Sequence, residues 1–209
     1  MGGLNRHPEY GVADRAALDA LLDSQWHGVL STVVEGGPWA VPMLYARDGD
    51  RLVLHGSTGA GALRLVAAGA PAVLSVVAVD ALAVAPTTFE SSLNYRSATV
   101  RGALTPLPDA EREAALDLFS DTVLPGRVAE VRRSSRKELA ATLAMTLPIG
   151  DDWLLKVTDG WPATPAEADA DPGVWSGLVP VRTVLDAPRA APWAEGLPVP
   201  PSVRRLTGG

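Results

Sequence analysis

One stretch combines the residue types and the spacing of an anion site. It runs from Leu52 to Leu65 and reads LVLHGSTGAGALRL. The pattern predicts an apolar strand, a turn of glycine and hydroxyl residues, and the start of a helix. Such a turn directs unpaired backbone N–H groups and the positive end of the helix dipole at one point, where an anion binds. Ser57 and Thr58 add hydroxyl donors, and Arg64 adds a charged donor. A phosphate-bearing ligand is one interpretation; a plain turn in which Ser57 caps the helix is the alternative.

The composition excludes several other chemistries. The 209 residues include no cysteine and only three histidines, so disulfides, thiolate catalysis and Cys- or His-rich metal centres are not expected. A net charge of −6 argues against a nucleic-acid partner. The chain has no run of 18 apolar residues and no signal-peptide core at its N-terminus. We therefore expect a cytoplasmic protein that acts on a small molecule away from membranes.

The elements that must position this stretch are mostly strands in hairpin order. Residues 26–34 and 39–47 flank the turn EGGP, and Asp48-Gly49 marks a second turn before residue 52. Further strands are predicted over 72–79, 81–85, 93–105, 144–157 and 174–185, and helices over 14–24, 60–69, 108–124 and 135–143. The nearly continuous apolar run from 72 to 85 indicates at least one strand buried on both faces. The whole pattern predicts a closed or split antiparallel barrel, mainly β with flanking helices.

The predicted organisation is one domain with two appendages. Residues 1–13 form an N-terminal arm, 14–186 the barrel domain, and 187–209 a proline-rich tail that we expect to be extended or loose. Within the strand over 93–105, alternation places Tyr95 and Ser97 on one face and Asn94 and Arg96 on the other.

Several motifs together resemble the pyridoxamine 5′-phosphate oxidase-like superfamily, in its flavin-nucleotide-binding or nitroimidazole-resistance-like branch. They are, in order, LYARDGDRL, LHGSTGAGALR, NYRS at 94–97, LPI at 147–149, Lys156-Val157 and VWSGLVPV at 174–181. The resemblance extends from about Arg6 to Val184. It implies an FMN-binding split β-barrel, antiparallel and homodimeric, with FMN sites at the interface between subunits.

The resemblance also implies the site residues. The ribityl-phosphate arm of FMN is expected beside the turn residues His55, Gly56, Ser57 and Thr58, with Arg64 one helical turn later. The isoalloxazine ring is expected beside Val41, Pro42, Met43 and Leu44, and the NYRS residues Asn94, Tyr95, Arg96 and Ser97 are expected near the cofactor. Trp175 is expected to reach the ring or substrate across the dimer, or else to be a core tryptophan.

Two departures from the family pattern bear on the cofactor. Gly61 stands where the family has a basic residue that holds the 5′-phosphate, which leaves Arg64 as the nearby cation. Glu90 and Ser91 stand where the family often has paired histidines. The barrel is therefore compatible with a changed ligand.

Three functional hypotheses follow. The first is an FMN-dependent oxidoreductase acting on a small molecule, with His55 as proton donor and Arg96 or Lys156 stabilising the reduced flavin. The second is a flavin-binding protein without catalysis. The third is a biosynthetic enzyme on the same barrel that uses haem, a deazaflavin or no cofactor. For haem, His27 and His55 are the only barrel histidines that can serve as axial ligand, although His27 also fits a solvent-exposed strand edge.

Overall fold

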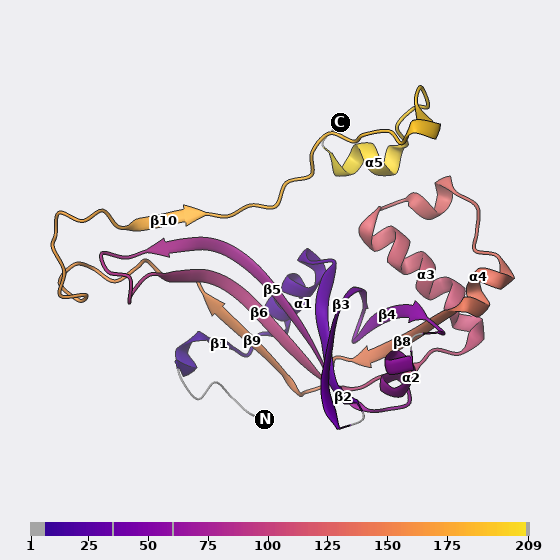
Figure 1. Ribbon diagram of the computed structural model, residues 1–209, viewed down its shortest axis with the longest axis horizontal. Helices are drawn as coiled ribbons and strands as arrows, with labels where there is room; N and C mark the ends of the chain where they lie inside the picture. Colours follow the sequence, from indigo (N-terminus) through magenta and orange to yellow (C-terminus); the bar gives the residue numbers. More distant parts are fainter. Residues whose placement is uncertain (1–6, 35, 60, 208–209) are drawn as a thin grey trace.

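The protein is built around one twisted antiparallel sheet (Figure 1). The computed structural model describes residues 7–34, 36–59 and 61–207. Within these residues the strand order is β1-β9-β6-β5-β2-β3-β4-β8-β7, and β10 pairs with the free part of β5. The strands are β1 (Gly11–Val12), β2 (His27–Val34), β3 (Gly37–Asp48), β4 (Arg51–Ser57), β5 (Pro71–Val84), β6 (Ser92–Ala103), β7 (Thr105–Pro106), β8 (Thr142–Pro148), β9 (Trp153–Thr158) and β10 (Gly177–Pro180).

Short helices close the ends and one side of this sheet. They are α1 (Arg15–Ser24), α2 (Gly61–Ala67), α3 (Asp109–Val123), α4 (Arg136–Ala141) and α5 (Pro201–Leu206), with 3-10 turns η1 (Pro8–Tyr10), η2 (Arg127–Glu130) and η3 (Pro192–Ala194). Among the described residues, no helix has the length and apolarity needed to span a bilayer.

The core lies between the concave side of the sheet and α1. Asp14 caps α1 by accepting a hydrogen bond from the backbone N–H of Ala16 at 2.9 Å. The apolar stripe Leu18, Leu21 and Leu22 then enters the core, as its helical spacing predicts. A second, smaller cluster forms where Phe119 of α3 and its apolar neighbours pack against β3, β4 and β8. The two clusters lie on opposite sides of the sheet, because Tyr45 of the first and Ala46 of the second are successive residues of β3.

The apolar run from 72 to 85 differs from its prediction. It forms the single strand β5, which carries a bulge between Val79 and Ala81. Alternate residues enter the core, but Val77 is 54% exposed on the other side. The prediction of a strand buried on both faces is therefore wrong for the isolated chain, because no element of the described chain covers that side.

Two other predicted strands are also corrected. Residues 144–157 form two strands, because β8 pairs with β4 whereas β9 pairs with β6. The predicted kink at 148–152 is the connection between these two strands, which do not pair with each other. Of residues 174–185, only Gly177–Pro180 pair with β5, so Trp175 lies before the strand rather than within it.

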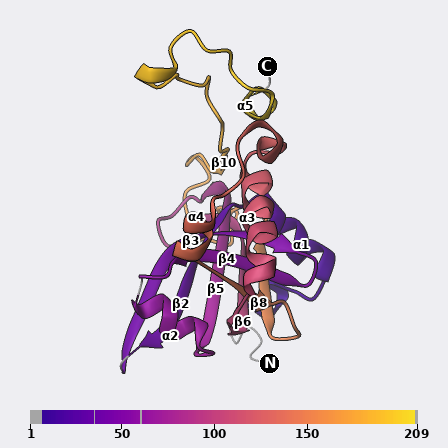
Figure 2. The same ribbon diagram turned by 90° about the vertical axis from the view of Figure 1, so that its right-hand side faces the viewer.

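The C-terminal tail is not loose at its end. It forms α5, which both views place beside the far end of α3 (Figures 1 and 2). The Ser202 backbone N–H and hydroxyl donate to the two carboxylate oxygens of Glu130 at 2.8 and 2.5 Å, and Ser202 is fully buried. These bonds, the hydroxyl first, lower the pKa of Glu130. Arg205 donates to the carbonyl of Pro125 at 2.6 Å. A six-residue helix held by such distant partners leaves little signal in its own sequence.

Replacement of Gly28 by alanine is expected to destabilise the barrel. A Cβ at Gly28 would lie 2.8 Å from the Ser75 carbonyl oxygen and 3.0 Å from a methyl group of Val76. Both atoms belong to the paired strand β5, so the backbone cannot retreat without breaking its ladder. We expect the free energy of unfolding to fall by about 1–3 kcal/mol in urea titrations. Gly150→Ala, with open space around its Cβ, is the control, and equal midpoints for the two variants would contradict the prediction.

Candidate functional site

On the side of the sheet opposite the main core, α3 covers only the part formed by β3, β4 and β8 around Ala46 and Val53. The rest of this side carries a mixed apolar and polar surface, which we call the open face. Its apolar members are 39–54% exposed and are Val29, Leu44, Val77, Val79, Leu82, Leu93 and Val179. Strand register places Ser97 opposite Val77 and Tyr95 opposite Val79, and it places Lys156 opposite Ser97. Pro42 pairs with Val29, and His27 pairs with Leu44. The open face thus combines an apolar floor with a row of polar groups along β6 and β9.

A cation lies at the polar side of the open face. The ammonium nitrogen of Lys156 is 5.0 Å from the centre of the Tyr95 ring and 5.7 Å from that of Tyr10. Tyr10 in turn stacks on His7 at 5.1 Å. Lys156 has no carboxylate partner among the described residues. A positive charge held by aromatic rings beside an apolar floor suits a planar ligand with negative charge.

Asn94 and Arg96 lie on the opposite side of β6. Asn94 is buried and donates to the Gly160 carbonyl at 2.8 Å. Arg96 makes a bidentate pair with Asp80, at 2.8 and 3.0 Å, and this bonding raises its pKa. Asp80 is the extra residue of the β5 bulge, which brings its carboxylate within reach of Arg96. The structure therefore brings Tyr95, Ser97 and Lys156 together but does not bring Arg96 to them.

His55 lies on the side of β4 that faces α3. Its ring meets the Phe119 ring edge-on at a centroid distance of 4.4 Å. The Nδ1 atom is buried and has no hydrogen-bond partner among the described residues. Burial lowers the pKa of His55, so the imidazole is neutral near pH 7. A neutral, half-buried imidazole with an unpartnered nitrogen has the form that binds a metal.

The turn after β4 has the predicted compact shape. A Cβ at Gly56, near the end of β4, would lie 2.3 Å from a methyl group of Leu63 and would displace that side chain. The Ser57 hydroxyl accepts from the Gly59 N–H at 3.1 Å and keeps its own proton for another acceptor. The Thr58 hydroxyl donates to the Ala141 carbonyl at 3.3 Å and is thus occupied. Within the described residues, Ser57 closes the turn rather than capping α2.

Arg64 projects from α2 beside this turn. It is exposed, and no ion pair joins it to any described carboxylate. Gly61, where the family pattern has a basic residue, begins the helix and provides no charge. The pairing of β3 with β4 ends at Tyr45 and Leu54, and β4 continues to Ser57 paired with β8.

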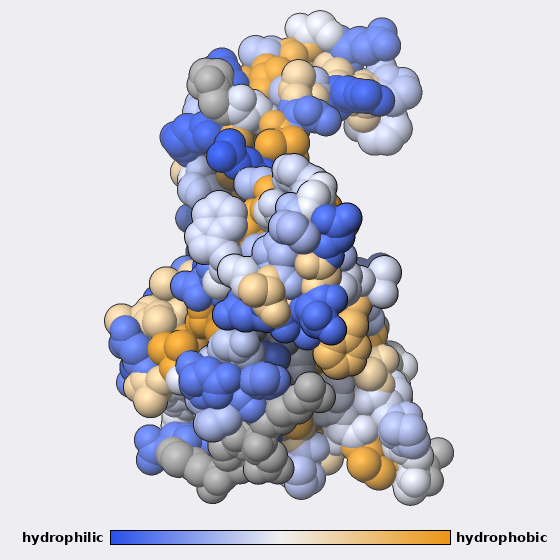
Figure 3. Space-filling view, turned by 90° about the vertical axis from the view of Figure 1, so that its left-hand side faces the viewer, coloured by the Kyte–Doolittle hydropathy of each residue, from blue (hydrophilic) through white to orange (hydrophobic). Residues whose placement is uncertain are grey.

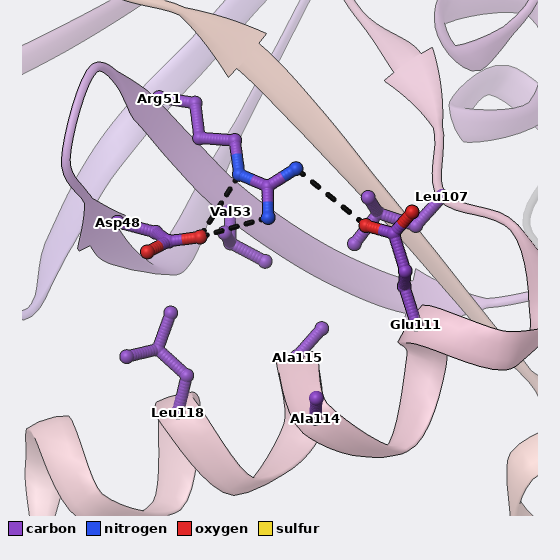
Figure 4. Close-up of a pocket in the computed structure, with 8 residues that line it drawn as sticks. All are labelled: Asp48, Arg51, Val53, Leu107, Glu111, Ala114, Ala115 and Leu118. Carbon is purple, nitrogen blue, oxygen red and sulfur yellow. Dashed lines mark hydrogen bonds and ion pairs between the residues drawn. The ribbon is translucent and has the colours of Figure 1, made fainter.

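A cavity of about 370 Å³ lies under α3 (Figure 4). Its walls are Val53, Leu107, Ala114, Ala115 and Leu118. At its mouth Arg51 bonds to Asp48 at 2.8 and 2.9 Å and approaches Glu111 at 3.6 Å. The carboxylates of Asp48 and Glu111 flank the guanidinium, so Arg51 is not available to an anionic ligand. Val53 and His55 share one side of β4, so the apolar cavity and the histidine are neighbours.

Strand alternation and loop position decide where the remaining predicted site residues lie. Val41 and Met43 pack against the core, whereas Pro42 and Leu44 lie on the open face. Trp175 is 66% exposed in the loop before β10, which is not the core position given as its alternative. Sequence reasoning missed the cavity under α3, although the spacing of Ala114, Ala115 and Leu118 was a usable signal for a face directed at the sheet.

Comparisons with known proteins are consistent across sequence and structure. A model of the pyridoxamine 5′-phosphate oxidase family matches residues 14–151. A solved "FAD and Heme binding protein" from Mycobacterium smegmatis is 47% identical, with a TM-score of 0.90, covering 95% of this chain and 97% of that one. The flavocytochrome Anf3 from Azotobacter vinelandii is 25% identical, with a TM-score of 0.89, covering 97% and 94%. No protein with a curated description matches by sequence.

A third structure is similar in fold alone. It is a putative 5-nitroimidazole antibiotic resistance protein from Bacteroides thetaiotaomicron, 19% identical with a TM-score of 0.58. The alignment covers 70% of this chain and 86% of that one. The first two structures thus match nearly the whole chain, whereas this one matches a smaller part.

Proposed function

The chain belongs to the pyridoxamine 5′-phosphate oxidase family, and from this premise we propose that it is an oxidoreductase that binds a flavin and a haem. The observation that carries the proposal is the 47% identity, over 95% of the chain, to a protein named for FAD and haem. The flavocytochrome supports it with the same near-complete coverage. Bound flavin exchanges one or two electrons and haem exchanges one, so a small-molecule donor or acceptor is part of the proposal.

The proposed flavin is FAD. FMN was the prediction from the motifs, and the 47% identical protein is named for FAD instead. The open face supports a flavin of either kind: Pro42 and Leu44 offer an apolar surface to the ring, and Lys156 offers a positive charge. Ser57 and Arg64 would hold the phosphate groups, through the free hydroxyl proton and the guanidinium.

The proposed haem ligand is His55. The fit rests on its buried Nδ1, which lacks a partner, and on the lowered pKa that keeps the ring neutral. The adjacent cavity under α3 has apolar walls, which suit a haem, and a charged mouth formed by Asp48, Arg51 and Glu111. His27 is exposed on the open face and is the second histidine available in the barrel. His7 is bonded to Glu9 at 2.9 Å.

We further propose a homodimer in which the open face is covered by a second copy. A contiguous surface of seven exposed aliphatic side chains is unusual for a monomer. Burial in a dimer would also account for the apolar run in β5, which reads as a strand covered on both sides. Ligand groups on the open face would then lie between subunits, where Trp175 is exposed and able to reach a partner.

An absorption spectrum of the purified protein tests the proposal. We expect a two-band flavin spectrum together with a Soret band, and heat release followed by chromatography should yield FAD. Release of FMN would overturn the choice of flavin. A colourless protein that takes up neither added FAD nor added haem would overturn the function.

The double variant Ser57→Ala, Arg64→Ala tests the phosphate assignment. It removes one hydroxyl donor and one charge, so we expect the flavin dissociation constant to rise about ten- to a hundredfold. Fluorescence titration of apoprotein with FAD measures the change. Arg204→Ala, an exposed arginine on α5, is the control. Equal affinities of the double variant and the control would show that the phosphates bind elsewhere.

A further inference from the structure

A segment of the C-terminal region crosses the molecule without packing on it. We call residues 181–200 the strap; it joins β10 to α5 and contains η3. In Figures 1 and 2 it runs apart from the rest of the ribbon. The Val181 N–H bonds to the Asp80 carbonyl at 2.9 Å, and the next hydrogen bonds to another part of the chain are those of Ser202. Between these two points, no described residue forms a hydrogen bond or ion pair outside the strap and its junction with α5.

The strap is rich in exposed apolar side chains. Trp193 is 87% exposed, Val184 74% and Leu197 67%. Hydrophobic residues are visible among hydrophilic ones along the top of the molecule, where the strap and α5 lie (Figure 3). Both ends are fastened, by the ladder of β10 and by the buried Ser202, so the segment is neither a free tail nor a linker to another domain. When such side chains stay exposed to water, no apolar burial offsets the conformational entropy that an ordered extended chain loses.

We propose that the strap lies along the second copy of this chain and clasps the dimer. This inference rests on the proposed homodimer and adds a second contact surface to it. The strap is continuous with the open face, because Val179 belongs to that face and the strap starts two residues later. A partner that covers the open face at β10 is therefore already beside the first residues of the strap.

Charge and backbone chemistry favour the same occupant. The strap carries Arg182 and Arg189 against Asp186 and Glu195, so its formal charge is zero within a chain of net charge −6. A neutral strap does not repel a second acidic copy, and it lacks the excess of basic residues that membranes or nucleic acids attract. Prolines at 188, 192, 198 and 200 remove backbone donors, so the contact is made by side chains rather than by an added strand.

Site-specific cross-linking tests the clasp directly, because the chain has no native cysteine. In Leu197→Cys, a benzophenone maleimide attached to the strap is expected to give a covalent dimer on illumination. The matched control is Leu65→Cys, an exposed leucine on α2 at 47% exposure, which should give no dimer. Cross-links within one subunit only at position 197 would overturn the proposal.

Affinity provides the second measurement. Trp193→Ala is expected to raise the dimer dissociation constant about tenfold or more in sedimentation experiments. The midpoint of thermal unfolding of the monomer should not change in this variant, since the side chain is exposed within the subunit. If the wild type is a stable dimer and Trp193→Ala dimerises with the same affinity, the proposed strap contact is refuted and the homodimer is not. A monomeric wild type would refute both the strap contact and the homodimer. The flavin and haem content tests the proposed cofactors independently.

Discussion

Replacing His55 with alanine is expected to abolish the Soret band of the purified protein while the flavin bands remain. His55 combines a buried, unpartnered Nδ1 with a pKa lowered by burial, so the neutral ring is available as a ligand. Without an imidazole, we expect haem occupancy to fall at least about tenfold, since the remaining contacts are apolar. Absorbance at the Soret maximum, normalised to protein, measures the loss.

Two further variants make this result specific. His55→Gln keeps a polar side chain of similar reach against Phe119, so loss of haem there cannot be ascribed to a collapsed α3. His27→Ala, on the open face, should keep the full Soret band. The reverse outcome, with haem retained in both His55 variants and lost in His27→Ala, would move the haem to the open face and refute the assignment.

The lowered pKa of His55 also predicts how the stability of the folded protein changes with pH. Protonation puts a charge on a half-buried ring, so the folded state resists it more than the unfolded chain does. The contribution of neutral His55 to the stability of the apoprotein is complete above the usual value of 6.5 and is lost as the pH falls below it. In His55→Gln this part of the pH dependence should be absent.

Replacing Val77 with aspartate is expected to convert the dimer into a folded monomer. Val77 lies near the centre of the open face, with Ser97 and Val79 around it, and is 54% exposed in the single chain. An aspartate there remains hydrated in the monomer but would be buried without a partner in the dimer. We expect the dimer dissociation constant to rise about a hundredfold or more, as measured by sedimentation velocity.

The control for Val77→Asp introduces the same charge elsewhere. Leu65→Asp, on the exposed side of α2, should leave the dimer intact. Flavin content is a second readout: if ligand groups lie between subunits, FAD should be lost together with the dimer. A Val77→Asp protein that still dimerises with wild-type affinity would exclude the open face as the interface.

Local sequence signals predicted much of the fold because their causes are local. Gly49, with a positive φ of 59°, makes the turn between β3 and β4 that Asp48-Gly49 indicates. The capping residue Asp14 and the leucine spacing define α1. Alternation in β6 correctly separates Tyr95 from Arg96. The mainly antiparallel fold with flanking helices is thereby confirmed, and its family relationship with it.

The errors arise where the deciding partner is far away in the chain. The bulge in β5 brings Asp80 into an ion pair with Arg96. The motif alone presents Arg96 as a cation near the cofactor. Likewise, α5 depends on Glu130, 72 residues before Ser202. Neither partner leaves a mark in the short window from which a motif is read.

By itself, the sequence determined the strand order along the chain, the strand, turn and helix around His55, the absence of thiol chemistry and the family. Hydrophobic periodicity and turn residues encode these features directly. Only the tertiary structure decided which residues share a surface: it placed Lys156 between Tyr10 and Tyr95, set His55 against Phe119, and left part of one side of the sheet open. An apolar residue is equally apolar whether its own core or a second chain covers it, and only the packed fold distinguishes the two.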